Sequence, residues 1–254
     1  MLCQHHYKVS LPKHPSSILC IPLNMLSYTE ENYLKALLHL TVEQGTKKEA
    51  GTNELAAHLL VKPATTNDML KKLNEKKLVD YKKYGKSSLT VEGKKRAIEV
   101  VRKHRLWETF LFQKLEFTWD EVHAVAEQLE HIQSQKLVDK LDKFLNFPAV
   151  DPHGDVIPNA KGIMKLSVKK TLEEEVTGHA CTMIGVKNNT ASFLQYVDKV
   201  GLSIHNPVKI ISRQEYDDSI EIEVKGKRSN VSRKFAENII IVCGECDAHK
   251  GKKK

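Results

Sequence analysis

The stretch Thr52-Asn-Glu-Leu-Ala-Ala-His-Leu59, followed by the break Val61-Lys-Pro63 and a further stretch from Ala64 to Glu75, decides how this chain folds. The first stretch has the apolar spacing of a short helix with Thr52 as its N-cap, and Pro63 suits the start of the next helix. In the later stretch, apolar residues recur three and four positions apart, as on the buried face of a helix. Two helices joined by a tight turn make a helix-turn-helix.

A β-hairpin is expected directly behind these two helices. Leu78 to Tyr81 and Ser88 to Val91 have the composition of short strands, and Lys83-Tyr-Gly-Lys86 between them is typical of a turn. A hairpin in this position is a wing, so the sequence predicts a winged helix-turn-helix. Ahead of it, apolar residues at helical spacing predict a helix from Met25 to about Gln44, with Thr29 as its N-cap.

Three more helices and a change of composition follow the hairpin. The helices are expected from Gly93 to about Leu115, from near Thr118 to His131, and from Ser134 to about Leu145. The Pro-rich segment from Phe147 to Pro158 then indicates a domain boundary. Beyond it, β-branched runs separated by turn signals predict a small all-β module of five or six strands. These runs are Cys181–Val186, Val208–Ser212, Ile220–Val224 and Ile239–Val242.

Composition limits the class of protein. The chain has 254 residues, of which 41% are hydrophobic and 28% are charged, as in ordinary globular proteins. The net charge of +8 suits a polyanionic partner but does not require one.

The five cysteines are scattered and lack the pattern of a secreted disulfide framework. The pair in Cys243-Gly-Glu-Cys246 has no second cysteine pair at the spacing of a zinc site, so reduced, inert thiols are expected. Because no apolar run approaches the roughly 18 residues of a membrane span, we expect a cytoplasmic protein with no membrane partner.

The strongest chemical signal is His123-Ala-Val-Ala-Glu127-Gln-Leu-Glu130-His131. Residues three and four apart share a helix face, so its two imidazoles and two carboxylates form one stripe. His104 and Glu108 form a similar pair on the preceding helix, and antiparallel packing would gather all six donors. Nitrogen and oxygen donors without thiolate suit Mn²⁺, Fe²⁺ or Zn²⁺, and the oxygen-rich mixture favours Mn²⁺. Single His–Glu pairs also occur on the solvent-exposed faces of helices, but the complete set of six donors favours a metal site.

The helix-turn-helix and the wing offer a second set of functional candidates. Small polar side chains near the start of the second helix suit base edges and phosphates, and lysines suit phosphates. Asp68 is expected to face away from phosphate. The alternative interpretation is a solvent-facing charged helix beside an ordinary surface hairpin. The candidate DNA-binding residues are Thr52, Pro63, Ala64, Thr65, Thr66, Asn67, Lys71, Lys72, Lys82, Lys83 and Lys86.

Four motifs resemble the diphtheria toxin repressor and manganese transport regulator family: Tyr28-Thr-Glu-Glu-Asn-Tyr-Leu34, Arg102-Lys-His-Arg-Leu106, Leu129-Glu-His131 and Asp151-Pro-His-Gly154. The resemblance extends from about Leu26 to Pro158, and more faintly to Val242. It implies a homodimer with a winged helix, a helical dimerisation and metal-binding domain and an SH3-like domain. Members bind double-stranded operator DNA when Fe²⁺ or Mn²⁺ is abundant and shut down metal-uptake genes, so no enzymatic activity and no small-molecule substrate are expected.

The resemblance implies the same six ligands that the spacing selects and adds Asn32. Iron sensors tend to have Cys where this chain has Glu127, which favours Mn²⁺ here. Asn32 falls where iron sensors have Met and manganese sensors have Asp, and its amide oxygen remains a donor. Lys35 falls where short manganese regulators have another acidic ligand, and a protonated lysine cannot bind a metal. The stretch from Asn189 to Phe193 offers weaker donors than the ligands that the third domain supplies in some members.

The sequence therefore predicts a mainly α fold divided as follows: a disordered extension at 1–24, the winged helix-turn-helix at 25–95, the helical domain at 96–147, a Pro-rich linker at 148–168, the SH3-like domain at 169–242 and a basic tail at 243–254. Met25 is an alternative translation start. One competing hypothesis is a DNA-binding regulator with a structural metal or another effector. A two-metal phosphoesterase is another, but it gives the helix-turn-helix no role. An adaptor built on the β-module has no residue signature.

Overall fold

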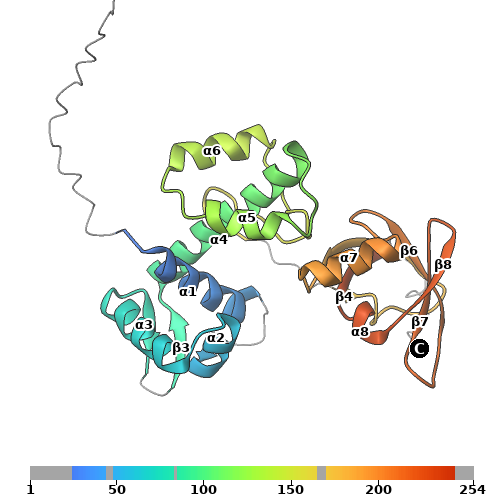
Figure 1. The fold of residues 1–254 in the computed structure, drawn as a ribbon, viewed down its shortest axis with the longest axis horizontal. Helices are drawn as coiled ribbons and strands as arrows, with labels where there is room; N and C mark the ends of the chain where they lie inside the picture. Colours follow the sequence, from blue (N-terminus) through green and yellow to red (C-terminus); the bar gives the residue numbers. More distant parts are fainter. Residues whose placement is uncertain (1–24, 44–47, 83–84, 165–169, 244–254) are drawn as a thin grey trace, which may run out of the picture.

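The computed structural model describes residues 25–43, 48–82, 85–164 and 170–243, so the predictions for 1–24, Lys83 and the tail after 243 lie outside it. Figure 1 shows a helical unit with a small hairpin, a second helical unit around α5 and α6, and a separate sheet domain. The long helix α4 (Val91–Lys114) runs from the first unit into the second. This shared helix connects the wing with the site described below.

The first unit begins with α1 (Tyr28–Leu38), which continues into a π-helical turn, η1 (His39–Glu43). Its N-cap is Ser27, so the prediction of Thr29 was wrong. The Ser27 hydroxyl accepts the Glu30 backbone N–H at 3.3 Å, and the Glu30 carboxylate accepts the Ser27 backbone N–H at 2.9 Å. This reciprocal capping box fixes the start of the helix, because it satisfies two backbone donors at once.

The predicted helix-turn-helix is confirmed as α2 (Thr52–His58) and α3 (Pro63–Glu75), with Pro63 in the first turn. Thr52 is the first helical residue and Gly51 is the cap, which corrects the prediction of Thr52 as N-cap. The reason is a strand that the sequence did not reveal, β1 (Ala50–Gly51), which pairs with the wing and leads the chain into α2 at Gly51.

The wing consists of β2 (Val79–Tyr81) and β3 (Lys86–Leu89), and the three-stranded sheet has the order β1-β3-β2. The second strand ends earlier than predicted because Thr90 caps α4, accepting the Gly93 backbone N–H at 3.0 Å. Buried residues of α1, α2, α3, the wing and the first turns of α4 share one core. The winged unit is therefore built on the same helix that carries the next domain.

The helical domain contains α5 (Val122–Leu129) and α6 (Gln135–Phe144), both beside α4. α5 is shorter than the helix predicted from Thr118. The Glu121 carboxylate accepts the Thr118 backbone N–H at 2.9 Å and its hydroxyl at 2.7 Å, so this segment forms a turn instead. Apolar residues of α5 pack on the second half of α4, which brings the two candidate ligand helices together.

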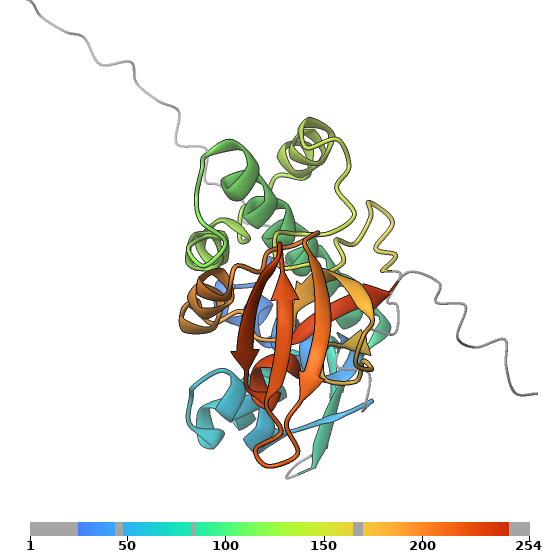
Figure 2. The same ribbon diagram turned by 90° about the vertical axis from the view of Figure 1, so that its right-hand side faces the viewer.

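The C-terminal domain is a six-stranded antiparallel sheet with the order β4-β9-β5-β6-β7-β8, seen face-on in Figure 2. Its strands are β4 (Lys170–Thr171), β5 (Ala180–Val186), β6 (Pro207–Arg213), β7 (Ile220–Val224), β8 (Lys227–Val231) and β9 (Ile239–Cys243). The predicted sheet is confirmed. The two-residue strand β4, the polar strand β8 and two helices, α7 (Ala191–Val200) and α8 (Arg233–Ala236), were not predicted. α7 escaped notice because only Leu194, Val197 and Val200 mark its buried face.

The linker segment from Val150 to Val156 lies against the sheet domain. The Val186 backbone N–H donates to the His153 carbonyl at 3.0 Å. Gly154 has a φ of +83°, and a Cβ there would lie 1.9 Å from the Ile184 carbonyl oxygen, so only glycine fits this approach. The close contact holds Asp151 and His153 in place between β5 and the helical domain.

Cys181 is disulfide-bonded, which contradicts the expectation of reduced thiols throughout the chain. The antiparallel pairing of β5 with β9 places the Cα of Cys181 opposite that of Cys243 in the register, an arrangement that the scattered cysteine positions did not reveal. Cys3, Cys20 and Cys246 lie outside the described residues. Among the helices that the structure describes, none combines the length and apolarity needed to cross a membrane.

Candidate functional site

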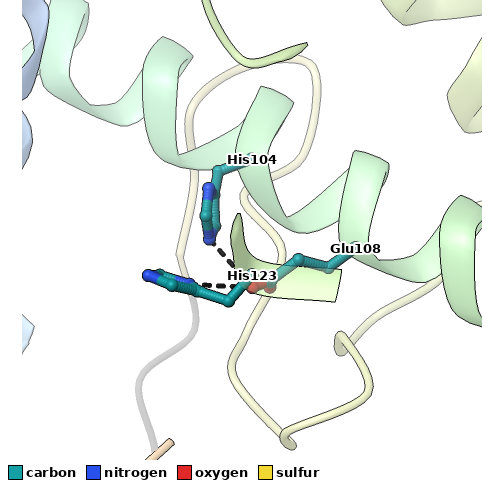
Figure 3. A group of neighbouring side chains, drawn as sticks. All are labelled: His104, Glu108 and His123. Carbon is teal, nitrogen blue, oxygen red and sulfur yellow. Dashed lines mark hydrogen bonds and ion pairs between the residues drawn. The ribbon is translucent and has the colours of Figure 1, made fainter. Parts of the chain in front are cut away.

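Three predicted ligands meet where α4 and α5 pack together. His104 and Glu108 lie one turn apart on α4, and the His104 Nε2 is 2.9 Å from the Glu108 Oε1. His123 reaches the same oxygen from α5, with its Nδ1 at 3.3 Å. Figure 3 shows both imidazoles directed at this carboxylate. One donor atom from each residue lies within 4.8 Å of the others, which is close enough for one ion. We call this group the Glu108 centre.

In the Glu108 centre, a buried carboxylate and an imidazole stabilise each other's charged form. Burial alone would raise the pKa of Glu108, but the charge and hydrogen bond of His104 lower it well below the ordinary range. Burial alone would lower the pKa of His104, but the Glu108 carboxylate raises it to about 9. A carboxylate with 2% of its side chain exposed is thus held as an anion by neighbouring positive charge.

A second group contains two further predicted ligands, Glu127 and Glu130, and again His104. The His104 Nδ1 lies 2.6 Å from the Glu130 Oε2, so one imidazole connects both groups. The Lys35 ammonium, from α1, donates to Glu127 at 2.5 Å and to both oxygens of Glu130 at 2.8 Å. A side chain that the sequence indicated as unable to bind metal therefore contacts two of the expected ligands.

The last two predicted ligands are Asn32 and His131, of which His131 lies next to Glu130 of the second group. The His131 Nδ1 is 2.5 Å from the Glu31 Oε2, and its ring stacks on Tyr28 with the centroids 4.4 Å apart. Its Nε2 is 3.8 Å from Glu130. The Asn32 Oδ1 is buried and has no hydrogen-bond partner in the described part of the chain. Among the described residues, His131 is not a member of the three groups of imidazole and carboxylate donors that lie close enough together for one ion.

Sequence reasoning missed two residues that join the centre from the linker, Asp151 and His153. With Glu108 they form a further, fully buried group of possible ligands. The His153 Nδ1 is 3.7 Å from the Glu108 Oε2, and its Nε2 is 2.7 Å from the Trp119 carbonyl oxygen. Burial and the Glu108 charge raise the pKa of Asp151 to about 7. The only sequence signal for these two residues was the Asp151-Pro-His-Gly154 motif. Loop residues have no regular spacing, so their contact with a helix cannot be predicted from the sequence.

The donor sets can be tested for their fit to an ion. The Glu108 centre offers carboxylate oxygens and imidazole nitrogens without thiolate, and the side chain of His104 is 10% exposed. Such a set suits Mn²⁺, Fe²⁺ or Zn²⁺. The buried, unpartnered oxygen of Asn32 is consistent with a further cation near α1. The pair Glu127 and Glu130, in contrast, already contacts the Lys35 ammonium. The fit is therefore good at the Glu108 centre and poor beside Lys35.

The candidate DNA-binding residues divide into exposed and engaged side chains. Pro63, Ala64 and Thr65 are exposed at the start of α3, as predicted. Thr66 is fully buried and its hydroxyl lies 3.4 Å from that of Tyr33, so its prediction as a DNA contact was wrong. The reason is helical geometry: Thr66 shares the inner face of α3 with Leu70 and Leu73.

Other candidates on α3 also have protein partners. The Tyr81 hydroxyl donates to the Asn67 side-chain oxygen at 2.9 Å, which ties α3 to the wing. Lys71 is 3.0 Å from the exposed Asp68, and Lys72 is 3.1 Å from Glu30. The two lysines keep about half of their side-chain surface exposed, at 53% and 54%.

The wing lysines Lys82 and Lys86 are exposed. Together with Thr52 and Asn67, Lys86 lines a shallow groove of about 510 Å³ between the start of α2 and the wing. Because α3 presents its exposed N-terminal side chains while the wing presents lysines, the winged unit offers the side-chain chemistry of a phosphate-binding face.

Comparison with known proteins assigns the family. Residues 25–86 match the N-terminal DNA-binding domain of iron-dependent repressors, residues 90–159 match their metal-binding and dimerisation domain, and residues 170–243 match the FeoA domain. The chain is 32% identical to a manganese-dependent transcriptional repressor solved in complex with manganese. That similarity covers 84% of this chain and 99% of the other, with a TM-score of 0.75. The chain belongs to the family of metal-dependent transcriptional repressors.

Two curated relatives extend this family assignment. The iron-dependent repressor IdeR of Mycobacterium bovis is 33% identical over 146 residues, which are 58% of this repressor and 61% of that protein. A probable metal transport system membrane protein of Chlamydia trachomatis is 45% identical over 71 residues, 28% of this repressor and 16% of that protein. The chain thus spans about three fifths of the first relative and about one sixth of the second. The family consists of DNA-binding repressors rather than enzymes, as predicted.

Proposed function

We propose that this repressor binds double-stranded operator DNA as a homodimer when a divalent ion, with Mn²⁺ favoured over Fe²⁺ or Zn²⁺, is held at the Glu108 centre. The single observation that supports this most is the convergence of His104, Glu108 and His123 from two helices on one buried carboxylate. Metal-uptake genes are the proposed targets, and the cytoplasm is the proposed site of action. The match to part of a probable metal transport protein supports this choice of targets.

The residues that would hold the ion are His104, Glu108 and His123, with Asp151 and His153 available from the linker. A bound ion would supply the positive charge that lets carboxylates and neutral imidazoles from separate elements share one buried site. Every protein group in the centre comes from α4, α5 or the linker, so it fixes the helical domain against the segment that contacts β5. The absence of thiolate and the oxygen content favour Mn²⁺.

The path from this centre to the DNA-binding unit consists of contacts made by α1 and η1. Glu31 of α1 contacts His131 at 2.5 Å, and its other oxygen accepts from Gln133 at 2.7 Å. Glu43 of η1 accepts from Arg105 at 2.7 Å. Because α1 also packs in the core of the winged unit, its position fixes the direction of α3. In a homodimer, that direction sets whether two α3 helices match adjacent major grooves.

A gel-shift titration on a fragment containing the operator tests this function. We expect binding with Mn²⁺ and a loss of at least tenfold in affinity with chelator. Glu108→Gln, which keeps the shape but removes the charge, should bind equally weakly with and without Mn²⁺. Glu99→Gln, an exposed change on the same helix, is the control and should behave like the natural protein. Equal binding of the natural protein with Mn²⁺ and with chelator would defeat the proposed function.

The runner-up is a DNA-binding regulator whose metal is structural or whose effector is something else. A sensor must exchange its ion reversibly at micromolar concentrations, whereas a structural ion is retained during dialysis. Dialysis of the metal-loaded protein against metal-free buffer, followed by measurement of metal content and of unfolding temperature, separates the two. Retention of the ion with unchanged DNA binding would favour the structural role.

A further inference from the structure

The Lys35 side chain crosses from the DNA-binding unit to the helical domain. It leaves α1 and places its ammonium between two carboxylates of the segment around the end of α5. The nitrogen is 2.5 Å from the Glu127 Oε1 and 2.8 Å from each oxygen of Glu130. Three short contacts use all three N–H donors that an ammonium has. The side chain is 19% exposed, so this is a partly enclosed contact and not a solvated surface pair.

The two carboxylates need a cation. Glu130 is completely buried and Glu127 has 34% of its side chain exposed. A buried carboxylate without compensating charge is strongly destabilising. His104 contributes one hydrogen bond to Glu130 at 2.6 Å, but its other nitrogen faces the Glu108 centre. The Lys35 ammonium contacts both carboxylates at hydrogen-bonding distance, whereas the His104 Nδ1 is 4.0 Å from the Glu127 Oε1.

Building on the proposed metal-dependent repression, we propose that the Lys35 ammonium takes, as a permanent internal cation, the place that a second divalent ion would occupy between Glu127 and Glu130. Each protomer then holds its regulatory ion at the Glu108 centre alone. A divalent ion within about 4 Å of an ammonium would be repelled strongly, even at the effective dielectric of a protein surface. The two cations thus exclude each other from this position.

The surrounding donors explain why the lysine is the deciding residue. Glu127 and Glu130 supply carboxylate oxygens, and the His131 Nε2 lies 3.8 Å from the Glu130 Oε1. Asn32, one turn before Lys35 on α1, has a buried oxygen without a hydrogen-bond partner in the described residues. This mixture of oxygen and imidazole suits Mn²⁺. Replacing the ammonium with a carboxylate on the same helix position would leave a nearly complete second set of ligands.

A consequence for α1 follows. Because the ammonium is covalently part of α1, it joins the winged unit to the helical domain whether or not any ion is bound. Glu31 and Glu43 add contacts to His131 and Arg105 along the same face. Lys35 is therefore a positioning residue, because it orients the DNA-binding unit through its contacts with Glu127 and Glu130. It also reduces the number of regulatory ions that each protomer binds.

Metal stoichiometry tests this directly. The full-length natural protein, Lys35→Glu, Lys35→Met and the control Lys136→Glu would be titrated with Mn²⁺ by calorimetry, with bound metal measured by mass spectrometry. Lys136→Glu makes the same charge change at an exposed position of the helical domain. We expect one ion per protomer for the natural protein and the control, and two for Lys35→Glu. Lys35→Met should gain a weaker second ion, because it frees the carboxylates without adding a ligand.

Every outcome decides the question. If neither Lys35 variant gains an ion, or if the natural protein already binds two, the internal-cation role of Lys35 is wrong. If the natural protein binds none, the proposed metal-dependent function fails by itself, and a gain of one ion in Lys35→Glu still supports the role of Lys35. Should the variants not fold, anomalous diffraction from Mn²⁺-soaked crystals of the natural protein decides: a peak at Glu108 alone supports the exclusion, and a peak between Glu127 and Glu130 overturns it.

Discussion

At the scale of single residues, neighbouring positions on one helix have opposite roles. Thr65 is exposed at the start of α3, whereas Thr66 is buried against Tyr33. A helix turns by about 100° per residue, so adjacent side chains face different surroundings. Both threonines were predicted as DNA contacts, because the local sequence pattern does not indicate which polar side chain packs against Tyr33.

The first prediction compares these two positions. Thr65→Val should weaken operator binding about tenfold, because a contact to DNA is worth about 1–3 kcal/mol. Thr66→Val should leave DNA affinity nearly unchanged but lower the unfolding temperature, because it removes the buried hydroxyl beside Tyr33. Fluorescence anisotropy with labelled duplex and thermal unfolding measure the two effects. A larger loss of affinity in Thr66→Val than in Thr65→Val would show that α3 presents a different face to DNA.

At the scale of elements, short polar contacts connect helices and loops that are far apart in the sequence. Arg105 of α4 contacts Glu43 of η1 at 2.7 Å and donates to the Val156 carbonyl at 2.7 Å. Burial alone would raise the pKa of Glu43, but hydrogen bonds and charge from His39 and Arg105 lower it to about 2. The contact therefore stabilises the fold only while Glu43 is ionised.

The second prediction is a loss of stability in acid that depends on Glu43. Because the pKa of Glu43 in the folded protein lies below its ordinary value of 4.5, its contribution is complete above about pH 5 and is lost as the pH falls from about 4.5 to about 2. The full contribution is on the order of 3 kcal/mol. Denaturant unfolding at a series of pH values should show a shallower acid decline for Glu43→Gln. Parallel curves for both proteins would mean that the carboxylate is not ionically held.

The third prediction concerns the contact between the linker and β5. Gly154→Ala should lower the free energy of unfolding by about 2–4 kcal/mol, because it combines a positive φ with a backbone clash. Gly201→Ala is the matched control: its φ is +87°, yet a Cβ there meets nothing within 4 Å, so it reports the φ strain alone. Equal losses in the two variants would show that the close approach to Ile184 carries no energy.

Elements with local signals could be predicted from the sequence, and those that depend on distant contacts could not. The helix-turn-helix, the wing and the helix carrying His104 follow from spacing within a few turns of chain. Strand β1 was missed because two residues have no period, and its pairing with β3 exists only in the folded chain. The same limit applies to the site: His104, Glu108 and His123 were predicted from helical spacing, but His153 reaches Glu108 from a loop, at 3.7 Å.

At the scale of the whole molecule, net charge and the coupling between metal binding and DNA binding determine the affinity for DNA. The chain carries a net charge of +8, and exposed lysines lie on the wing. Binding that neutralises DNA phosphates releases counterions, so the affinity for DNA should fall steeply as the salt concentration rises.

The fourth prediction is that Lys82→Ala and Lys86→Ala each reduce the slope of log affinity against log salt by about 1, without changing sequence preference. Lys136→Ala on the helical domain should leave the slope unchanged. An unchanged slope in both wing variants would place the wing away from DNA.

We infer that occupancy of the Glu108 centre by an ion and binding of operator DNA are coupled. If Mn²⁺ raises the affinity for operator DNA by a certain factor, operator DNA must raise the affinity for Mn²⁺ by the same factor. The most direct measurement is therefore the Mn²⁺ affinity of the natural protein with and without saturating operator duplex, with a scrambled duplex as control. We predict an increase of at least tenfold with the operator. Identical Mn²⁺ affinities in the three conditions would contradict the claim.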